Sequence, residues 1–258
     1  MTTEPLKLYS HADHRQDRWL VEDVFPGKRG GYFLDIGAGP DGVTNSNSYA
    51  LETQLGWTGI CVEAHPDRYE QVRANRRCIV EHVAISDAPG EVEFTLNLDL
   101  PGTSAVLSEL SEPSRRDDYE GGQRTRTIRM PAVPLADLLA KHDMPAVIDY
   151  MSLDIEGSEW VALRDFPFDR YTFLTMTIER NAGRYLDLQK LLLAKGYRVA
   201  HNYCVDDFWY HPSLDYRPGL ATKLATGARR AWRQFYDRAP GLALRRVGRA
   251  LRGGQRRD

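Results

Sequence analysis

A short apolar run that ends in a glycine-rich turn constrains the fold of this chain more than any other feature. The run covers residues 32–36, and it is followed by Gly37 and Gly39. Glycine at such positions permits a positive φ and a close approach of the backbone to a ligand. A second apolar run, at 59–62, ends in Glu63. A strand, a glycine-rich turn, a helix and a strand tipped by a carboxylate form the nucleotide half-site of an open α/β sheet, where the acid accepts hydrogen bonds from two ribose hydroxyls.

Two acidic residues beside the turn bear on which ligand it holds. The letters from Gly37 to Gly42 fit the dinucleotide pattern G-x-G-x-x-G. However, Asp35 precedes the turn and Asp41 lies inside it, and two carboxylates would repel a pyrophosphate. S-adenosylmethionine (SAM) carries a sulfonium and an α-ammonium group, so these charges favour SAM over NAD. A glycine-rich turn without a ligand is the remaining alternative.

The composition predicts one large α/β domain, alone or with an appendage. The chain has 258 residues, of which 42% are apolar, and this suffices for a full core. No run approaches the ~18 apolar residues of a membrane span, and the first residues are too polar for a signal peptide. The three cysteines are widely spaced, which is typical of core residues in a reducing compartment rather than of disulfides or zinc ligands. We therefore expect a cytoplasmic protein.

Apolar runs alternate with helical segments along most of the chain. The expected helices cover residues 17–24, 45–55, 66–75, 134–141 and 186–194, with a further short helix that ends near Leu163. The expected strands cover residues 32–36, 58–63, 78–85, 91–96, 129–133, 146–153, 173–178, 197–202 and 204–211. This alternation, closed by a hairpin-like pair, predicts a mainly parallel sheet with an antiparallel edge strand.

Two segments fall outside this alternation. Residues 97–127 are polar and lack a clear periodicity, so they are either disordered or a lid, and their place on the cofactor side of the sheet favours a lid. Residues 217–258 hold 12 Lys and Arg against two Asp and Glu, a net charge of +10, whereas residues 1–216 carry −12. We therefore divide the chain into an acidic domain at 1–216 and a basic tail at 217–258.

The basic tail predicts an amphipathic helix. Apolar residues recur at helical spacing from Leu220 to Phe235, with Lys and Arg on the opposite side, and a weaker amphipathic stretch continues to Leu251. Such a helix can lie on the anionic inner surface of a membrane, pair two copies of the chain through residues 220–251, or pack on its own domain. Nucleic acid, which the tail would contact by charge alone, is the least favoured partner.

Five segments of the chain resemble the FkbM-type SAM-dependent methyltransferases. They read FLDIGAGPDGVTNSN, GICVEAHP, VAISDAPGEVEF, MSLDIEGSEW and NYCVDDFWYHP, and they fall within residues 16–212. The resemblance implies a Rossmann-like class I methyltransferase fold, with a seven-stranded sheet into which the last strand inserts antiparallel. It also implies O-methylation of sugars, polyketides or other secondary metabolites. It does not cover the basic tail.

The same resemblance implies roles for individual residues. The glycine turn corresponds to the cradle for the methionine end of SAM, and Glu63 corresponds to the ribose acid. Ala84 borders the adenine, and Asp154, at the end of the fourth strand, lies next to the methyl group. The residues expected to bind SAM are Asp35, Gly37, Ala38, Gly39, Ser46, Glu63, Ala84 and Asp154.

Methyl transfer to a hydroxyl needs a group that takes the proton. Asp154 and Glu156 follow a buried strand and His201 flanks the final strands, so these three are the expected catalytic residues. Glu159 is more simply explained as an acid in the first turn of a helix, and Glu179 by an ion pair with Arg180 or another nearby cation. Asp154, Glu156 and Glu159 are also enough to hold Mg²⁺, but a metal is not the favoured interpretation.

These observations predict a SAM-dependent O-methyltransferase that acts on a hydroxyl of a small molecule or glycan, namely a sugar, glycolipid or natural product. One alternative is N-methyl or carboxyl-methyl transfer. Another is a SAM-binding scaffold protein that has lost its chemistry. An enzyme requires acids beside an open pocket, whereas a scaffold predicts a filled or apolar pocket.

Overall fold

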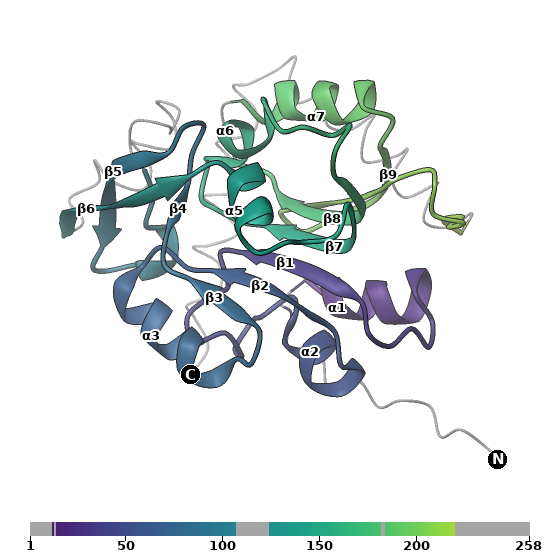
Figure 1. The fold of residues 1–258 in the computed structure, drawn as a ribbon, viewed down its shortest axis with the longest axis horizontal. Coiled ribbons are helices and arrows are strands. Elements are labelled where there is room, and N and C mark those ends of the chain that lie inside the picture. Colours follow the sequence, from purple (N-terminus) through teal and green to yellow (C-terminus); the bar gives the residue numbers. More distant parts are fainter. Residues whose placement is uncertain (1–11, 13, 107–123, 182–183, 220–258) are drawn as a thin grey trace, which may run out of the picture.

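Strands and helices alternate along the computed structural model, which describes residues 12, 14–106, 124–181 and 184–219 (Figure 1). The helices are α1 (Gln16–Arg18), the π-helix η1 (Trp19–Val24), α2 (Tyr49–Leu55), α3 (Pro66–Asn75), the 3₁₀ helix η2 (Pro101–Thr103), α5 (Leu135–Lys141), α6 (Glu159–Leu163) and α7 (Tyr185–Ala194). The strands are β1 (Tyr32–Ile36), β2 (Thr58–Val62), β3 (Ile79–Glu81), β4 (Ala84–Ile85), β5 (Gly90–Asn97), β6 (Thr125–Val133), β7 (Val147–Leu153), β8 (Thr172–Glu179), β9 (Arg198–Tyr203) and β10 (Asp206–Tyr210). The predicted α/β alternation is confirmed.

The main sheet has seven strands in the order β3-β2-β1-β7-β8-β10-β9. Neighbours from β3 to β8 pair in parallel, and β10 runs antiparallel to both β8 and β9. The mainly parallel sheet is confirmed, but the antiparallel strand does not lie at the edge as predicted. Every residue of β10 is buried, whereas β9 has exposed residues at both ends, so β10 occupies an inner position and β9 the edge.

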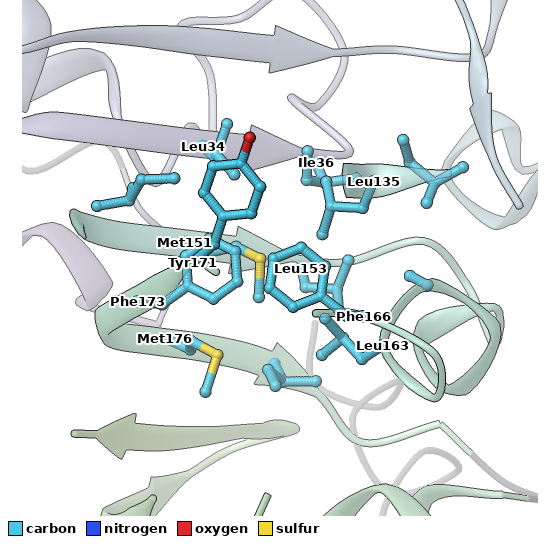
Figure 2. Close-up of a cluster of buried hydrophobic side chains, with 14 of the residues drawn as sticks. Leu34, Ile36, Leu135, Met151, Leu153, Leu163, Phe166, Tyr171, Phe173 and Met176 are labelled. Carbon is cyan, nitrogen blue, oxygen red and sulfur yellow. The ribbon is translucent and has the colours of Figure 1, made fainter. Parts of the chain in front are cut away.

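Helices cover both faces of the main sheet (Figure 1). On one face α5, α6 and α7 pack on the strands, and Figure 2 shows part of this cluster, which includes Leu34, Met151, Leu135 and Leu163. On the other face η1, α2 and α3 form a second cluster with strand residues that include Phe33. Alternate side chains of a strand point to opposite faces, so Leu34 packs in the first cluster and Phe33 in the second.

The expected strand at 78–85 is wrong, because the chain changes sheets within it. β3 extends the main sheet beside β2, whereas β4 pairs in parallel with β6 in a second sheet of order β4-β6-β5. Residues of β3 are exposed or half-buried, but Ala84 and Ile85 are both buried. Ala84 packs in a small apolar cluster with Phe94, Met130 and Ala132. Burial of Ala84 against the second sheet therefore accounts for the break.

The N-terminal segment packs against the far end of the main sheet. The expected helix at 17–24 is a short α-helix followed by the π-helix η1. Trp19 of η1 packs edge-on against Phe208 of β10, with ring centroids 5.0 Å apart, and against His201 of β9 at 5.8 Å. These contacts fix the residues just before α1 beside the carboxyl edge of β8.

No helix in residues 12, 14–106, 124–181 and 184–219 is both long and apolar enough to cross a membrane. Residues 97–106, at the start of the expected lid, are described, and η2 lies among them. The end of that segment, at 124–127, is described as well, and residues 125–127 belong to β6 rather than to a lid. Residues 107–123 and the amphipathic stretch at 220–251 lie outside the described residues. The lid, the tail and the boundary at 216 therefore stay predictions.

Candidate active site

A cavity lies at the carboxyl edge of the main sheet, where the strand order reverses between β1 and β7. The backbone N–H of Asp154 donates to the carbonyl oxygen of Ile36 (3.0 Å), and that of Gly37 donates to Val62 (2.9 Å). The cavity above these strand ends has a volume of about 410 Å³, within the range of roughly 300–1,000 Å³ found for small-molecule sites. Open α/β sheets bind ligands at such a switch point.

Backbone conformations with positive φ shape the cavity wall. Gly37 has a φ of 86°, and a Cβ atom there would lie 1.9 Å from the carbonyl oxygen of Asp154, so only glycine fits. Asn45 and Glu156 also line the cavity and have φ values of 60° and 56°. This conformation is uncommon for residues with a side chain, and such positions concentrate at ligand sites.

The structure brings most of the predicted site residues to this cavity. Those that line it are Gly37, Gly39, Ser46, Glu63, Ala84, Asp154 and Glu156. Ala38 is buried and is not part of the lining. His201 is not part of it either, because its ring stacks on Phe208 with centroids 4.1 Å apart.

Asp35 faces the α2 and α3 side of the sheet and does not reach the cavity. Its carboxylate accepts hydrogen bonds from Ser48 Oγ (2.5 Å) and Ser46 Oγ (3.4 Å), and it lies 3.9 Å from Nη1 of Arg76. Burial raises the pKa of Asp35, while Arg76 and the two serines act against that rise. Asp35 therefore anchors the segment 46–48, just before α2, to the end of β1.

Asp41 closes the loop that follows the turn. Its Oδ1 accepts hydrogen bonds from the backbone N–H groups of Val43 (2.9 Å) and Thr44 (2.6 Å). Although partial burial acts against it, these bonds lower the pKa of Asp41. Neither Asp35 nor Asp41 lines the cavity, so the geometry does not support the charge argument that favoured SAM over a dinucleotide.

Glu63 stands at the end of β2 and is almost fully buried in the cavity wall. One carboxylate oxygen accepts a hydrogen bond from the backbone N–H of His65 (2.8 Å). Burial raises the pKa of Glu63 to about 7, and the hydrogen bond from His65 and the charge of Arg68 limit the rise. His65 and Arg68 line the same part of the cavity. Glu63 is thus a directed acceptor for hydroxyl donors.

An apolar wall lies beyond the end of β2. Val83, Ala84 and Ile85 line it from the second sheet's side, together with Phe94 of β5 and Val106. The second sheet exists because the chain leaves the main sheet after β3. The sequence indicated Ala84 for this wall, but the position of Phe94 depends on the β5–β6 pairing.

Three acids gather at the other end of the cavity. Asp154 follows β7, Glu156 lies in the next turn, and Glu179 ends β8; one carboxylate oxygen from each lies within 4.8 Å of the others. Burial, and then the charges of Glu179 and Glu156, raise the pKa of Asp154 well above its usual range. The spacing would suit oxygen ligands of a divalent cation, with Glu179 in the place that was predicted for Glu159. Acidic residues alone do not define a metal site.

Glu159 supports this cluster from behind. It is 3% exposed, and Oε1 accepts hydrogen bonds from the backbone N–H groups of Ile155 (3.2 Å) and Gly157 (3.1 Å). The interpretation as an acid in the first turn of a helix is confirmed, because Glu159 is the first residue of α6. The side-chain amide of Asn181 donates to Glu159 (2.9 Å) and to Glu179 (2.6 Å). Arg180 pairs with Asp207 instead (2.7 Å), so the expected Glu179–Arg180 pair is wrong.

Sequence reasoning missed several residues of the cavity. These are His14, Gln16, Asn45, Asn47, Arg68, Phe94, Gly102, Ser158 and Val205. Ser158 Oγ and His65 Nδ1 are buried and have no hydrogen-bond partner among the described residues. Buried polar atoms are normally paired, so both atoms indicate a ligand of the cavity.

The fold and the site together define a Rossmann-like α/β protein with an open cavity at the switch point of its sheet, the place where such sheets bind their ligands. The family model described as the methyltransferase FkbM domain matches residues 35–199, which contain the glycine turn, Glu63 and all three clustered acids. The chain therefore belongs to the FkbM methyltransferase family. A comparison with curated proteins gives no match.

Proposed function

We propose that the protein is a SAM-dependent O-methyltransferase that acts on a hydroxyl of a sugar, glycolipid or natural product. The observation that carries the proposal is the polarity of one cavity: a ribose-type acid and an apolar wall lie at one end, and three acids at the other. The glycine turn lies between the two ends. This order matches a cofactor whose nucleoside and charged methionine ends must both be held.

The residues present fit SAM on three counts. Glu63 offers a buried carboxylate for the ribose hydroxyls, and His65 Nδ1 nearby is a buried polar atom without a partner among the described residues. Gly37 brings its backbone to the cavity without a side chain, at a position where a Cβ atom would clash with the carbonyl oxygen of Asp154. Asp154 and Glu156 supply negative charge for an ammonium and a sulfonium group. When bound, SAM supplies the methyl group and a good leaving group.

The chain's own residues have to orient the acceptor and exclude water. Asp154 and Glu156 face the end of the cavity where the methyl group would lie, and Glu179 completes that wall. Pro101, Gly102 and Ser104, from the described start of the expected lid, line the cavity as well. We infer that the acids bind the acceptor and that this segment helps to cover it.

The two alternatives, a scaffold protein and an N-methyltransferase, predict different properties for this cavity. A scaffold protein without catalysis predicts a filled or apolar pocket, whereas this cavity is open and carries acids at one end, which supports an enzyme. N-methyl transfer would use the same acids to bind an amine. The resemblance to O-methylating relatives favours the hydroxyl acceptor.

Acceptor profiling with methyl-labelled SAM tests the proposal. The full chain is incubated with cell extract, and the labelled products are separated and tested for stability to base. A base-stable ether in a sugar or natural product is the expected result. A labelled amine or a base-labile methyl ester would contradict O-methylation, and the absence of any labelled product would contradict the enzyme.

We further propose a cytoplasmic protein whose basic tail, through residues 220–251, makes peripheral contact with the inner membrane surface or pairs two copies of the chain. The support is the charge contrast between the two segments, +10 for residues 217–258 and −12 for residues 1–216. Nucleic acid remains an unexpected partner, because the tail offers charge without any base-reading motif.

A further inference from the structure

A histidine and a carboxylate form a pair in the wall of the cavity. Nδ1 of His14 lies 2.7 Å from Oδ2 of Asp206, and His14 is one of the residues that line the cavity. The pair joins the segment before α1 to the first residue of β10, 192 positions later in the sequence. The family match, which covers residues 35–199, includes neither residue.

The surroundings of Asp206 hold the imidazole in one orientation. Asp206 is 4% exposed, and Oδ2 also accepts a hydrogen bond from Nε2 of Gln16 (2.8 Å). The side-chain oxygen of Gln16 in turn accepts a hydrogen bond from the backbone N–H of His14 (3.0 Å). One amide therefore fixes both partners. A carboxylate that accepts Nδ1–H selects the tautomer in which Nε2 can take up a proton.

The pair stands at the end of the cavity that holds the three acids. Asp206 is the register partner of Glu179 in the pairing of β10 with β8, and neighbouring strands lie about 4.8 Å apart. Glu179 in turn reaches Asp154 and Glu156. Val205, next to Asp206, lines the same cavity. His14 therefore borders the space where the acceptor hydroxyl would meet the methyl group.

A histidine suits proton uptake here better than the acids do. Asp154, Glu156 and Glu179 hold carboxylate oxygens within 4.8 Å of one another, and burial, followed by the charges of Glu179 and Glu156, raises the pKa of Asp154 well above its usual range. Histidine exchanges protons in the neutral range. An imidazolium formed on His14 would lie against the carboxylate of Asp206, whose Oδ2 is 2.7 Å from Nδ1.

We propose that His14 is the general base of the methyl transfer and that Asp206 is its positioning residue; this rests on the function proposed above. In the step, the acceptor's hydroxyl oxygen forms a bond to the methyl carbon while the bond from that carbon to sulfur breaks. The electron pair of the broken bond stays on sulfur, and the hydroxyl proton moves to Nε2 of His14. The positive charge of the sulfonium is thus replaced by that of the imidazolium.

Kinetics of His14→Gln test the proposal. Turnover should fall by about 10²–10⁴-fold, the usual contribution of a general base, while the Kd for SAM, measured by calorimetry, is unchanged. The acid limb of the pH profile of kcat should disappear. The ring faces Asp206 on β10 and Tyr203 on β9, and Glu179 and Arg180, at the end of β8, lie beside Asp206. Asp206→Asn should lower turnover less and move the limb.

A matched control and a second variant separate catalysis from structure. His142 pairs with Glu81 (2.5 Å), a similar pair outside the cavity lining, so His142→Gln should keep full turnover. His14→Asn repeats the main test with a shorter amide, and circular dichroism checks that each variant is folded. Equal losses of turnover in the His14 and His142 variants would overturn the proposal.

A readout that does not depend on turnover is the tautomer of the ring. Nitrogen NMR of the full chain without ligands should show His14 with its proton on Nδ1, and Asp206→Asn should remove this preference. A proton fixed on Nε2 would overturn the proposal. A second outcome is that the wild type transfers methyl groups and His14→Gln keeps both its turnover and the acid limb of its pH profile. In that case His14 is not the base, but the proposed function still holds. If the wild type methylates no acceptor at all, both the proposed function and the assignment of His14 as the base are wrong.

Discussion

A Cβ atom at Gly37 would lie 1.9 Å from the carbonyl oxygen of Asp154. Gly37 follows β1 and Asp154 follows β7, so this close approach joins the glycine turn to the acid cluster. The close backbone contact in the cavity lining therefore also sets the place where Asp154 leaves the sheet.

Gly37→Ala should destabilise the protein more than Gly30→Ala does. Both glycines have positive φ, 86° and 69°, but a Cβ atom at Gly30 would meet nothing within 4 Å. We expect an additional loss of about 1–3 kcal/mol in the free energy of unfolding at Gly37, the usual cost of overpacking. Urea denaturation measures both variants. Equal losses of unfolding free energy in the two variants would show that the loop after β7 moves away from the new Cβ atom without a cost.

Glu63→Ala should weaken SAM binding by about 2 kcal/mol, or about 30-fold in Kd, because a charged acceptor for two hydroxyls is lost. Calorimetry measures the Kd. Glu91→Ala, on the exposed end of β5, is the matched control and should leave the Kd unchanged. The same experiment with NAD tests the choice of cofactor, since tight NAD binding without SAM binding would refute the proposed function.

Asp154→Ala and Glu156→Gln should each lower turnover by about 10²-fold, because a misplaced acceptor reacts that much more slowly. The Kd for SAM should change much less than turnover does, and Asp165→Ala, with an exposed carboxylate, should keep full activity. Chelation of divalent cations should leave the wild-type activity intact. A loss on chelation that Mg²⁺ restores would instead make Asp154, Glu156 and Glu179 metal ligands.

Glu159→Gln should change how stability depends on pH. Burial raises the pKa of Glu159 from 4.5 to about 7, so between these values the folded chain holds a proton that the unfolded chain has lost. The free energy of unfolding of the wild type therefore falls as pH rises through this window, by about 3 kcal/mol at most from this group. In Glu159→Gln this contribution to the fall in the free energy of unfolding is absent, because glutamine does not titrate.

Urea denaturation at pH 5 and pH 8 measures the difference. Glu159→Gln should gain stability relative to the wild type at pH 8, and Glu70→Gln, with a side chain 61% exposed, should show no such gain. A wild type and Glu159→Gln variant with the same pH dependence would mean that Glu159 is already ionised well below pH 7.

Truncation after Arg217 should leave SAM affinity intact, because the last strand of the main sheet ends at Tyr210. The removed residues should carry binding to anionic vesicles or self-association, since they hold the amphipathic stretch at 220–251. Sedimentation with and without vesicles separates the two roles, and replacement of the tail arginines by glutamine is the matched control for charge. Unfolding on truncation would place the tail in the core.

Several features of the site could be predicted from the sequence because they depend on neighbouring residues. The turn at Gly37 and the acid at Glu63 each follow an apolar run directly. Ala84 and Asp154 followed from the resemblance. All four line the cavity.

Other features could not be predicted, because they depend on partners that are remote in the sequence. Asp35 was predicted to bind the cofactor, yet its carboxylate lies 3.9 Å from Arg76, 41 positions later, on the side of the sheet away from the cavity. His201 had the right residue type, but Phe208 and Trp19 pack against its ring. His14 carried no signal at all, since only the folded chain brings it to Asp206.

The sequence by itself determined the class of fold and the kind of cofactor half-site, because apolar periodicity, glycine turns and strand-end acids are local properties. Only the tertiary structure decided which acids meet and which strand lies at the edge. Glu179 rather than Glu159 joins Asp154, because parallel pairing sets the ends of β7 and β8 side by side. Such contacts follow from strand order and burial, which no single stretch of the chain encodes.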